Sequence, residues 1–386
     1  MREGWEYKKL GEVSIYPTKR LSLTNLSGQQ YVGVETLIKD RGGVSFSDEL
    51  PKVDNAIEFM KNDILIGNIR PYLKKIWKAD RYGASSGDVI TIRVADNFVS
   101  RLNPSYLYNV LSSDSFFEYD NINTHGAKMP RGDRKAIAEF IIPIPPLSIQ
   151  LSIVSEIDMI SEMISKYDEQ LKELDKLSQS IFYEMFGDPV ENEKGWESYS
   201  LEKVCSSIVR GPFGSALKKE YFVNPDETTY KVYEQKHAIQ KDAEIGNYYI
   251  TKEKFNELSR FEVKSGDIIM SCSGTIGELY AIPSGSKKGL INQALLKFTL
   301  NEKICVSFFL FLMDCVKKDF TVRGTGLQNI GSVNIIKAME FGLPPLPLQQ
   351  SFARKIEAIE AMKSKVREAK KEAETLLASR MQYWFE

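Results

Sequence analysis

Apolar residues recur at alternating steps of four and three through a long stretch that contains neither proline nor glycine. The stretch covers residues 148–186, and its apolar positions are Ile157, Ile160, Ile164, Tyr167, Leu171, Leu174, Ile181 and Met185. Steps of this kind form the heptad pattern of coiled coils. Gly187 and Pro189 end the stretch, as residues that stop helices do. The pattern predicts one continuous long helix.

A second uninterrupted stretch covers residues 349–385 and is rich in the good helix formers Ala, Lys and Glu. Its thinner apolar seam keeps the same phase and consists of Phe352, Ile356, Ile359, Val366, Ala373 and Leu377. A helix of about 38 residues is about 57 Å long at about 1.5 Å per residue. Since neither helix has enough apolar surface to be stable alone, we expect the two to pack together. The alternative is two unrelated surface helices on separate domains.

The chain contains one internal repeat with a period of about 200 residues. The first half opens with Gly4-Trp5-Glu6 followed by Leu10, and the second half opens with Gly195-Trp196-Glu197 followed by Leu201 at the same spacing. The segment PPLSIQLSIV at 145–154 corresponds to PPLPLQQSFA at 344–353, and that register continues without a gap to the end of each long helix. Each half therefore has a globular part, a proline-rich joint and one long helix.

The globular parts have a mixed α/β pattern. Short apolar runs at 63–66, 89–92, 267–270 and 295–298 predict strands, and the stretches 106–117 and 307–320 predict helices. We expect globular domains at 1–147 and 188–346 and long helices at 148–187 and 347–386. A common framework with divergent globular parts indicates one scaffold that presents two different binding surfaces.

Composition excludes several classes of protein. The net charge of −1 is not typical of a nucleic-acid binder, so any DNA contact has to come from local basic patches. The four cysteines lack CxxC spacing, and with only two histidines a structural zinc site is not expected. The charged start of the sequence does not resemble a signal peptide, and no run of about 18 apolar residues predicts a membrane span. We expect a cytoplasmic protein with free thiols.

No motif predicts an active site. Asn103-Pro104-Ser105-Tyr106 approaches the tetrad of adenine methyltransferases but lacks its second proline. Gly324-Thr325-Gly326 follows a predicted helix rather than a strand, and no Walker A sequence is present. A carboxylate–carboxylate–lysine set at Asp226, Glu234 and Lys236 arises easily in a chain with 27% charged residues. We therefore expect a recognition or scaffold protein that is not itself an enzyme.

Taken together, these features resemble the DNA-specificity subunits of type I restriction–modification systems. The resemblance covers nearly the whole chain. It lies in the Pro-Pro-Leu joints, the Gly-Trp opening of each half, the helix end SIFYEMFGD at 180–188, and the pieces RGPFGS at 210–215 and INQ at 291–293.

The resemblance implies two target-recognition domains at opposite ends of an antiparallel helix pair, related by a pseudo-two-fold repeat. Each domain would read one half-site of double-stranded DNA, while the helices set the spacer. It also implies two methyltransferase subunits and further restriction (translocase) subunits as partners. S-adenosylmethionine, ATP and Mg would be on those partners, with no cofactor in this chain. The alternatives are the recognition chain of a related bipartite methyltransferase outside type I, and a coiled-coil scaffold that binds only protein.

Basic and polar residues in loops that follow strands are the candidates for DNA contact, because phosphates give affinity and base edges give specificity. Arg70 is a candidate for bidentate contact with guanine, Lys74 and Lys75 for phosphates, and Gln328 or Asn329 for adenine. The full candidate set is Arg70, Tyr72, Lys74, Lys75, His125, Lys128, Arg131, Arg210, Lys218, Lys219, Ser273, Thr275, Arg323, Gln328 and Asn329. The target sequence does not follow from the chain, since it depends on loop conformation and DNA shape.

Overall fold

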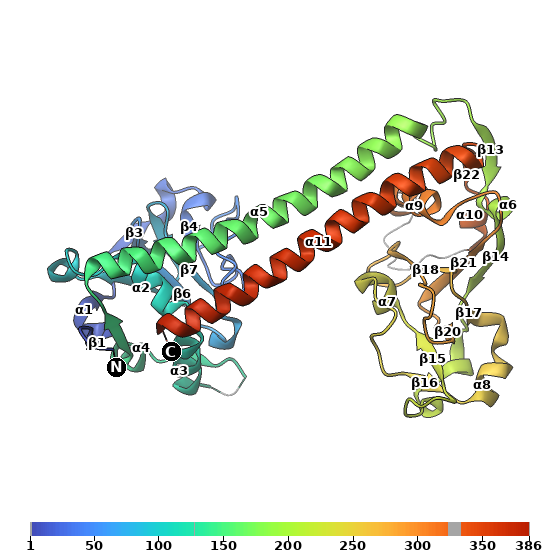
Figure 1. Ribbon diagram of the computed structural model, residues 1–386. Helices are drawn as coiled ribbons and strands as arrows, with labels where there is room; N and C mark the ends of the chain where they lie inside the picture. Colours follow the sequence, from blue (N-terminus) through green and yellow to red (C-terminus); the bar gives the residue numbers. More distant parts are fainter. Residues whose placement is uncertain (1, 127, 323–332, 386) are drawn as a thin grey trace. The chain divides into compact units, whose positions relative to one another are not determined.

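The computed structural model describes residues 2–126, 128–322 and 333–385 (Figure 1). It divides into unit 1, Met1–Glu169 with Arg367–Glu386, and unit 2, Gln170–Val366. Each unit contains one globular part and a segment of both long helices, α5 (Leu147–Phe186) and α11 (Leu346–Phe385). The two predicted helices are confirmed, and so is the mixed helix and strand content.

The globular part of unit 1 is built on two four-stranded sheets. The antiparallel sheet has the order β2 (Ser14–Ile15), β9 (Val89–Val94), β6 (Ile64–Gly67) and β7 (Ile76–Lys78). The mixed sheet has the order β3 (Arg20–Ser22), β5 (Asn55–Phe59), β8 (Gly83–Ser85) and β4 (Tyr31–Val32). The helices are α1 (Leu10–Val13), α2 (Pro104–Leu111), α3 (Asp114–Ile122) and α4 (Arg134–Glu139). β1 (Glu6–Lys9) pairs with β12 (Ile141–Ile144), which leads into α5.

Unit 2 repeats this plan. Its antiparallel sheet has the order β14 (Cys205–Arg210), β21 (Leu295–Leu300), β18 (Ile268–Ser271) and β19 (Leu279–Ala281). Its mixed sheet has the order β16 (Tyr249–Ile250), β15 (Tyr230–Tyr233), β20 (Gly289–Ile291) and β17 (Glu262–Val263). The helices are α6 (Leu201–Val204), α7 (Gln235–Gln240), α8 (Lys252–Glu257), α9 (Val306–Val322) and α10 (Val333–Lys337). β13 (Glu197–Ser200) pairs with β22 (Glu340–Leu343), which leads into α11.

One pair of glutamines anchors the start of both long helices in the same way. Gln150 and Gln349, which correspond in the sequence repeat, are fully buried. The Gln150 amide donates to the Arg101 and Pro145 carbonyls, and its oxygen accepts from the Asn103 N–H. Gln349 makes the corresponding three bonds in unit 2, to Lys303, Pro344 and Cys305. Since a buried amide is costly to leave unpaired, these bonds fix the joint between each globular part and its helix.

The helix segments pack antiparallel inside each unit. In unit 1, Glu156 near the start of α5 accepts hydrogen bonds from Arg380 and Trp384 near the end of α11. In unit 2, Phe182 and Phe186 near the end of α5 contact Phe352 near the start of α11, with ring centroids 5.5 Å and 5.3 Å apart. The predicted seam is therefore an interface between the two helices.

Two details of the fold differ from the sequence-based expectation. The stretch 106–117 forms two helices instead of one, because the Ser113 hydroxyl accepts from the Phe116 N–H and begins α3. The gap in the second seam between Ile359 and Val366 is filled by Lys363, which is only 5% exposed and corresponds to Ile164 in the repeat.

Replacing Lys363 by methionine is expected to raise the free energy of unfolding of unit 2 by about 1 kcal/mol. The Lys363 ammonium is removed from water. Its partner Asp175 is more than half exposed and its partner Glu360 is half exposed, so both carboxylates stay hydrated after the change. Denaturant titration of the variant measures this difference. The same replacement at the exposed Lys365 of α11 is the control, and a loss of stability in K363M beyond that of K365M would contradict the expectation.

Candidate nucleic-acid interface

Two loops of unit 1 that are about 50 residues apart in the sequence form one surface. The loop of residues 68–75 connects β6 to β7, and the second loop lies around β10 (Thr124–His125) and β11 (Arg131–Gly132). The Arg70 N–H donates to the Pro130 carbonyl over 2.7 Å, and the Gly132 N–H donates to the Asn68 carbonyl over 3.1 Å. These bonds bring the predicted residues Arg70, Tyr72, His125, Lys128 and Arg131 into one loop cluster.

The backbone of this cluster is strained. Arg70 and Lys74 have φ angles of 55° and 48°, in the left-handed region that side chains other than glycine rarely adopt. The neighbouring Asp40 and Arg41 also have positive φ, and their N–H groups donate to the Leu73 and Lys74 carbonyls. These four are among the seven such residues other than glycine in the described chain. Strain concentrated in this way is typical of functional loops.

The predicted contact residues of unit 1 differ in how free their side chains are. Arg70 and Lys128 are exposed, and Tyr72 at the loop tip is 50% exposed. The remaining candidates are held by the fold: Lys74 by Asp114, Lys75 by the Val34 carbonyl, Arg131 by Asp88 and His125 by Asp133. Arg70, Tyr72 and Lys128 are therefore best placed for an external partner, while Lys74 and Lys75 stabilise the loop.

A buried carboxyl lies beneath the cluster. Asp120 of α3 is fully buried, and neither of its oxygens has a hydrogen-bond partner among the described residues. Removal from water favours the neutral form, so burial raises the pKa of Asp120 to about 7. A Cβ atom at Gly132 would lie 2.3 Å from Asp120 Oδ1, so a larger residue at this position would have to displace the Asp120 carboxyl.

Unit 2 places its candidate residues at the corresponding end of its antiparallel sheet. Ser273 and Thr275 lie in the β18–β19 loop, the counterpart of the Arg70 loop. The Cys272 N–H donates to the Ala294 carbonyl, just as the Asn68 N–H donates to the Asp88 carbonyl. Arg210 ends β14, while Lys218 and Lys219 are exposed a little farther along the chain. The other predicted residues, Arg323, Gln328 and Asn329, lie outside the described residues.

Two residues absent from the candidate set join this surface. Gly211 packs so closely on the 291–293 turn that a Cβ atom there would be 1.9 Å from the Asn292 carbonyl oxygen. This contact brings the sequence pieces RGPFGS and INQ together and exposes Phe213 and Gln293. Phe213 is 68% exposed, and the Arg210 guanidinium lies 5.3 Å from its ring centroid. The sequence signal for both residues was that they lie in RGPFGS and INQ, two of the pieces that carry the family resemblance.

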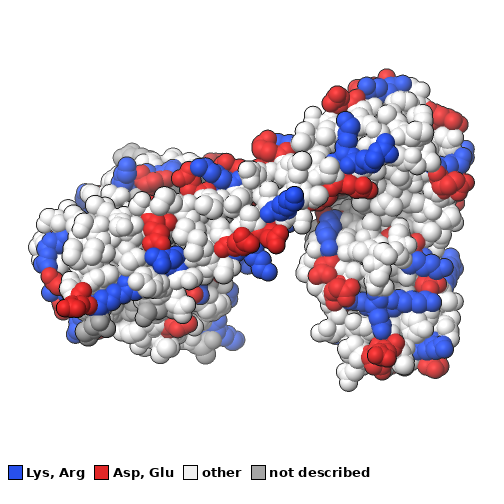
Figure 2. Space-filling view, in the orientation of Figure 1, with Lys and Arg blue, Asp and Glu red and all other residues white. Residues whose placement is uncertain are grey.

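The charges are mixed. Figure 2 shows Lys and Arg side chains interspersed with Asp and Glu on the face drawn, in agreement with a net charge of −1. No group of three or more His, Cys, Asp or Glu residues in the described part of the chain is arranged to hold a metal ion. Likewise, no helix among the described residues is sufficiently long and apolar to cross a membrane.

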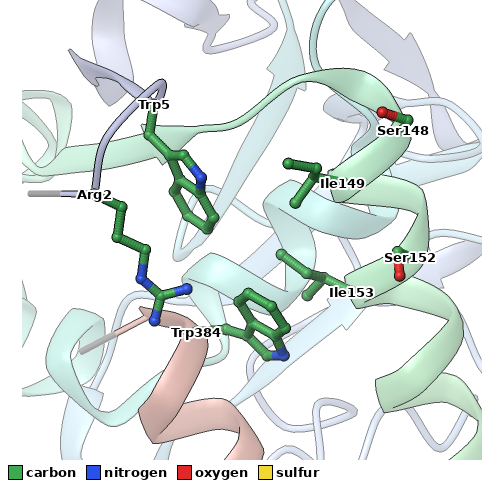
Figure 3. Close-up of a pocket in the computed structure, with 7 residues that line it drawn as sticks. All are labelled: Arg2, Trp5, Ser148, Ile149, Ser152, Ile153 and Trp384. Atoms are coloured by element: carbon green, nitrogen blue, oxygen red, sulfur yellow. The ribbon is translucent and has the colours of Figure 1, made fainter.

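An open cavity of about 430 Å³ lies at the first turns of α5 in unit 1 (Figure 3). It is lined by Arg2, Trp5, Ser148, Ile149, Ser152, Ile153 and Trp384. The Arg2 guanidinium lies 4.9 Å and 5.0 Å from the ring centroids of Trp5 and Trp384, whose planes are within 10° of parallel. These cation–π contacts join the two ends of the chain within unit 1. The lining contains no carboxylate, histidine or cysteine that would suggest catalysis.

Comparison with known proteins identifies consistent relatives. A family model described as the type I restriction modification DNA specificity domain matches residues 2–176 and 193–374. The provisionally named type I restriction enzyme MjaX specificity subunit of Methanocaldococcus jannaschii is 22% identical over 297 residues, which cover 72% of this chain and 68% of the relative. The provisionally named specificity subunit S.HindORF215P of Haemophilus influenzae is 23% identical over 296 residues, with coverage of 70% and 68%.

Solved structures show the same fold. A chain from a study of complex assembly and conformational transition in a type I R-M system superposes with a TM-score of 0.63 at 18% identity, covering 100% of this chain and 98% of its own. The S subunit of the type I restriction–modification system from M. genitalium gives a TM-score of 0.55 at 14% identity, covering 98% and 95%. The predicted arrangement of two globular domains and helical linkers is confirmed.

Proposed function

Because this chain belongs to the family of type I restriction–modification DNA specificity proteins, we propose that it reads a two-part DNA sequence, one half-site for each globular part. The observation that carries the proposal is the duplicated sheet with a loop cluster at the same end in both units. The chain itself would be non-catalytic. Two methyltransferase subunits would carry S-adenosylmethionine, and restriction subunits would carry ATP and Mg, on chromosomal DNA in the cytoplasm.

The different residues on equivalent loops support two different half-sites. The β6–β7 loop of unit 1 carries Arg70 and Tyr72, whereas the β18–β19 loop of unit 2 carries Ser273 and Thr275. An exposed arginine suits the paired acceptors of guanine in the major groove, while hydroxyl groups accept or donate with several bases. We therefore expect an asymmetric site rather than a palindrome.

Replacing Arg70 by alanine tests this function in the purified complex with its methyltransferase subunits. We expect affinity for the specific duplex to fall by about 1–3 kcal/mol, with relaxed preference at one base of one half-site. Replacing Lys128 by alanine is expected to weaken binding to all duplexes and to reduce the slope of log affinity against log salt by about 1. Fluorescence anisotropy titrations at several salt concentrations measure both effects.

The same titrations separate the proposal from its alternatives. A coiled-coil scaffold that binds only protein predicts no salt-dependent DNA affinity and no effect of either substitution. A recognition chain of a related bipartite methyltransferase outside type I predicts the same DNA binding, and assembly with restriction subunits then distinguishes the two systems.

A further inference from the structure

Asp114 is a single carboxylate that holds two cations beside the loop of residues 68–75. It is the first residue of α3, where a negative charge interacts favourably with the helix dipole. Its Oδ1 atom accepts from Lys74 Nζ over 2.5 Å and also from the Arg41 guanidinium. Hydrogen bonds from Lys74 and then Arg41 hold the pKa of Asp114 below its usual range, so the carboxylate stays charged near neutral pH.

Both cations lie on strained backbone. Lys74 has a φ of 48° and Arg41 a φ of 62°. The two turns are joined directly, because the Arg41 N–H donates to the Lys74 carbonyl over 2.9 Å. Arg41 is tied further by a bond from its Nε atom to the Ser112 carbonyl just before α3. Asp114 thus bridges two strained turns through its contacts with Lys74 and Arg41.

The position of this bridge has a direct consequence for the exposed residues. Lys74 ends the short 3-10 turn of Pro71–Leu73, and Arg70 begins it, also with a positive φ. A change of backbone at Lys74 would therefore move Tyr72 and Arg70. The bridge also engages two cations and offsets one of their two positive charges, which would otherwise attract any phosphate without regard to sequence.

We propose that Asp114 is a positioning residue for DNA recognition, fixing the loop of residues 68–75 so that Arg70 and Tyr72 face the bases while Lys74 and Arg41 are kept from phosphates. This inference rests on the proposed function. It assigns Asp114 a role in specificity without contact to DNA.

The test is the substitution Asp114→Asn in the complex with the methyltransferase subunits. We expect affinity for the specific duplex to fall roughly tenfold, while affinity for unrelated DNA rises. The slope of log affinity against log salt is expected to become steeper by up to about 2, because two cations are freed for phosphates. Base preference should relax only in the half-site that Arg70→Ala also affects, and Asp114→Glu should restore part of it.

Glu6→Gln is the matched control, since Glu6 is 52% exposed against 53% for Asp114 and pairs with Arg101 away from the loop. It should leave both affinities and the salt slope unchanged. If the wild-type complex binds specifically but Asp114→Asn leaves the base preference and the salt slope unchanged, the role of Asp114 is refuted and the proposed function is not. A wild-type complex with no sequence preference would instead refute the proposed function.

Discussion

Replacing Phe352 by alanine is expected to lower the free energy of unfolding of unit 2 by about 3–5 kcal/mol. Phe352 is fully buried, and its ring contacts Phe182 and Phe186 of α5 and Phe311 of α9 at centroid distances of 5.1–5.5 Å. The substitution leaves a cavity where the two long helices meet the globular part. Denaturant unfolding of the full chain measures the loss, and hydrogen exchange in α9 assigns it to unit 2.

Phe213→Ala is the control for that measurement. It removes the same ring from the same unit, but Phe213 is 68% exposed, so we expect a change of at most about 0.5 kcal/mol. Equal losses in the two variants would mean that the aromatic cluster does not stabilise unit 2 in the way described.

The second large effect is expected from Asp120→Asn, which should stabilise unit 1 increasingly as pH rises. Burial raises the pKa of Asp120 to about 7, against an ordinary value of 3.8. Between these pH values the Asp120 carboxyl is ionised in the unfolded chain but protonated in the folded chain. The parent protein therefore loses stability as pH rises. The difference between the two pKa values lowers the free energy of unfolding by on the order of 4 kcal/mol above pH 7. Asparagine has a similar shape and does not titrate.

Unfolding free energies of both proteins between pH 4 and pH 8 test this expectation. The two curves should converge near pH 4 and separate progressively up to about pH 7. A difference that does not vary with pH would contradict the account, because it would mean that the Asp120 carboxyl ionises alike in the folded and unfolded chain.

The features predicted well from the sequence are those with local or repeated signals. The long helices follow from heptad spacing without proline or glycine, and the duplicated plan follows from two segments that share one register. The strands at 64–67 and 268–271 follow from short apolar runs. The place of Lys363 on the seam follows from the same repeat, but its pairing with Asp175 does not, because the two residues are about 190 residues apart in sequence.

In the candidate site, too, the features with a local sequence signal were predictable and the tertiary contacts were not. The position of the Arg70 loop followed from the strand before it. The roles of Lys74 and Lys75 did not follow, because their partners Asp114 and Val34 are about 40 residues away in sequence. The union of this loop with the Pro130 segment is likewise a tertiary contact without a local signal.

The central claim is that each unit reads one half of a two-part DNA sequence. The most direct test is to co-express the chain with the methyltransferase subunits proposed as its partners and map methyladenine across the host genome by single-molecule sequencing. The account predicts an asymmetric bipartite motif with a fixed spacer that disappears when this chain is omitted. A single continuous motif, or methylation that persists without the chain, would contradict it.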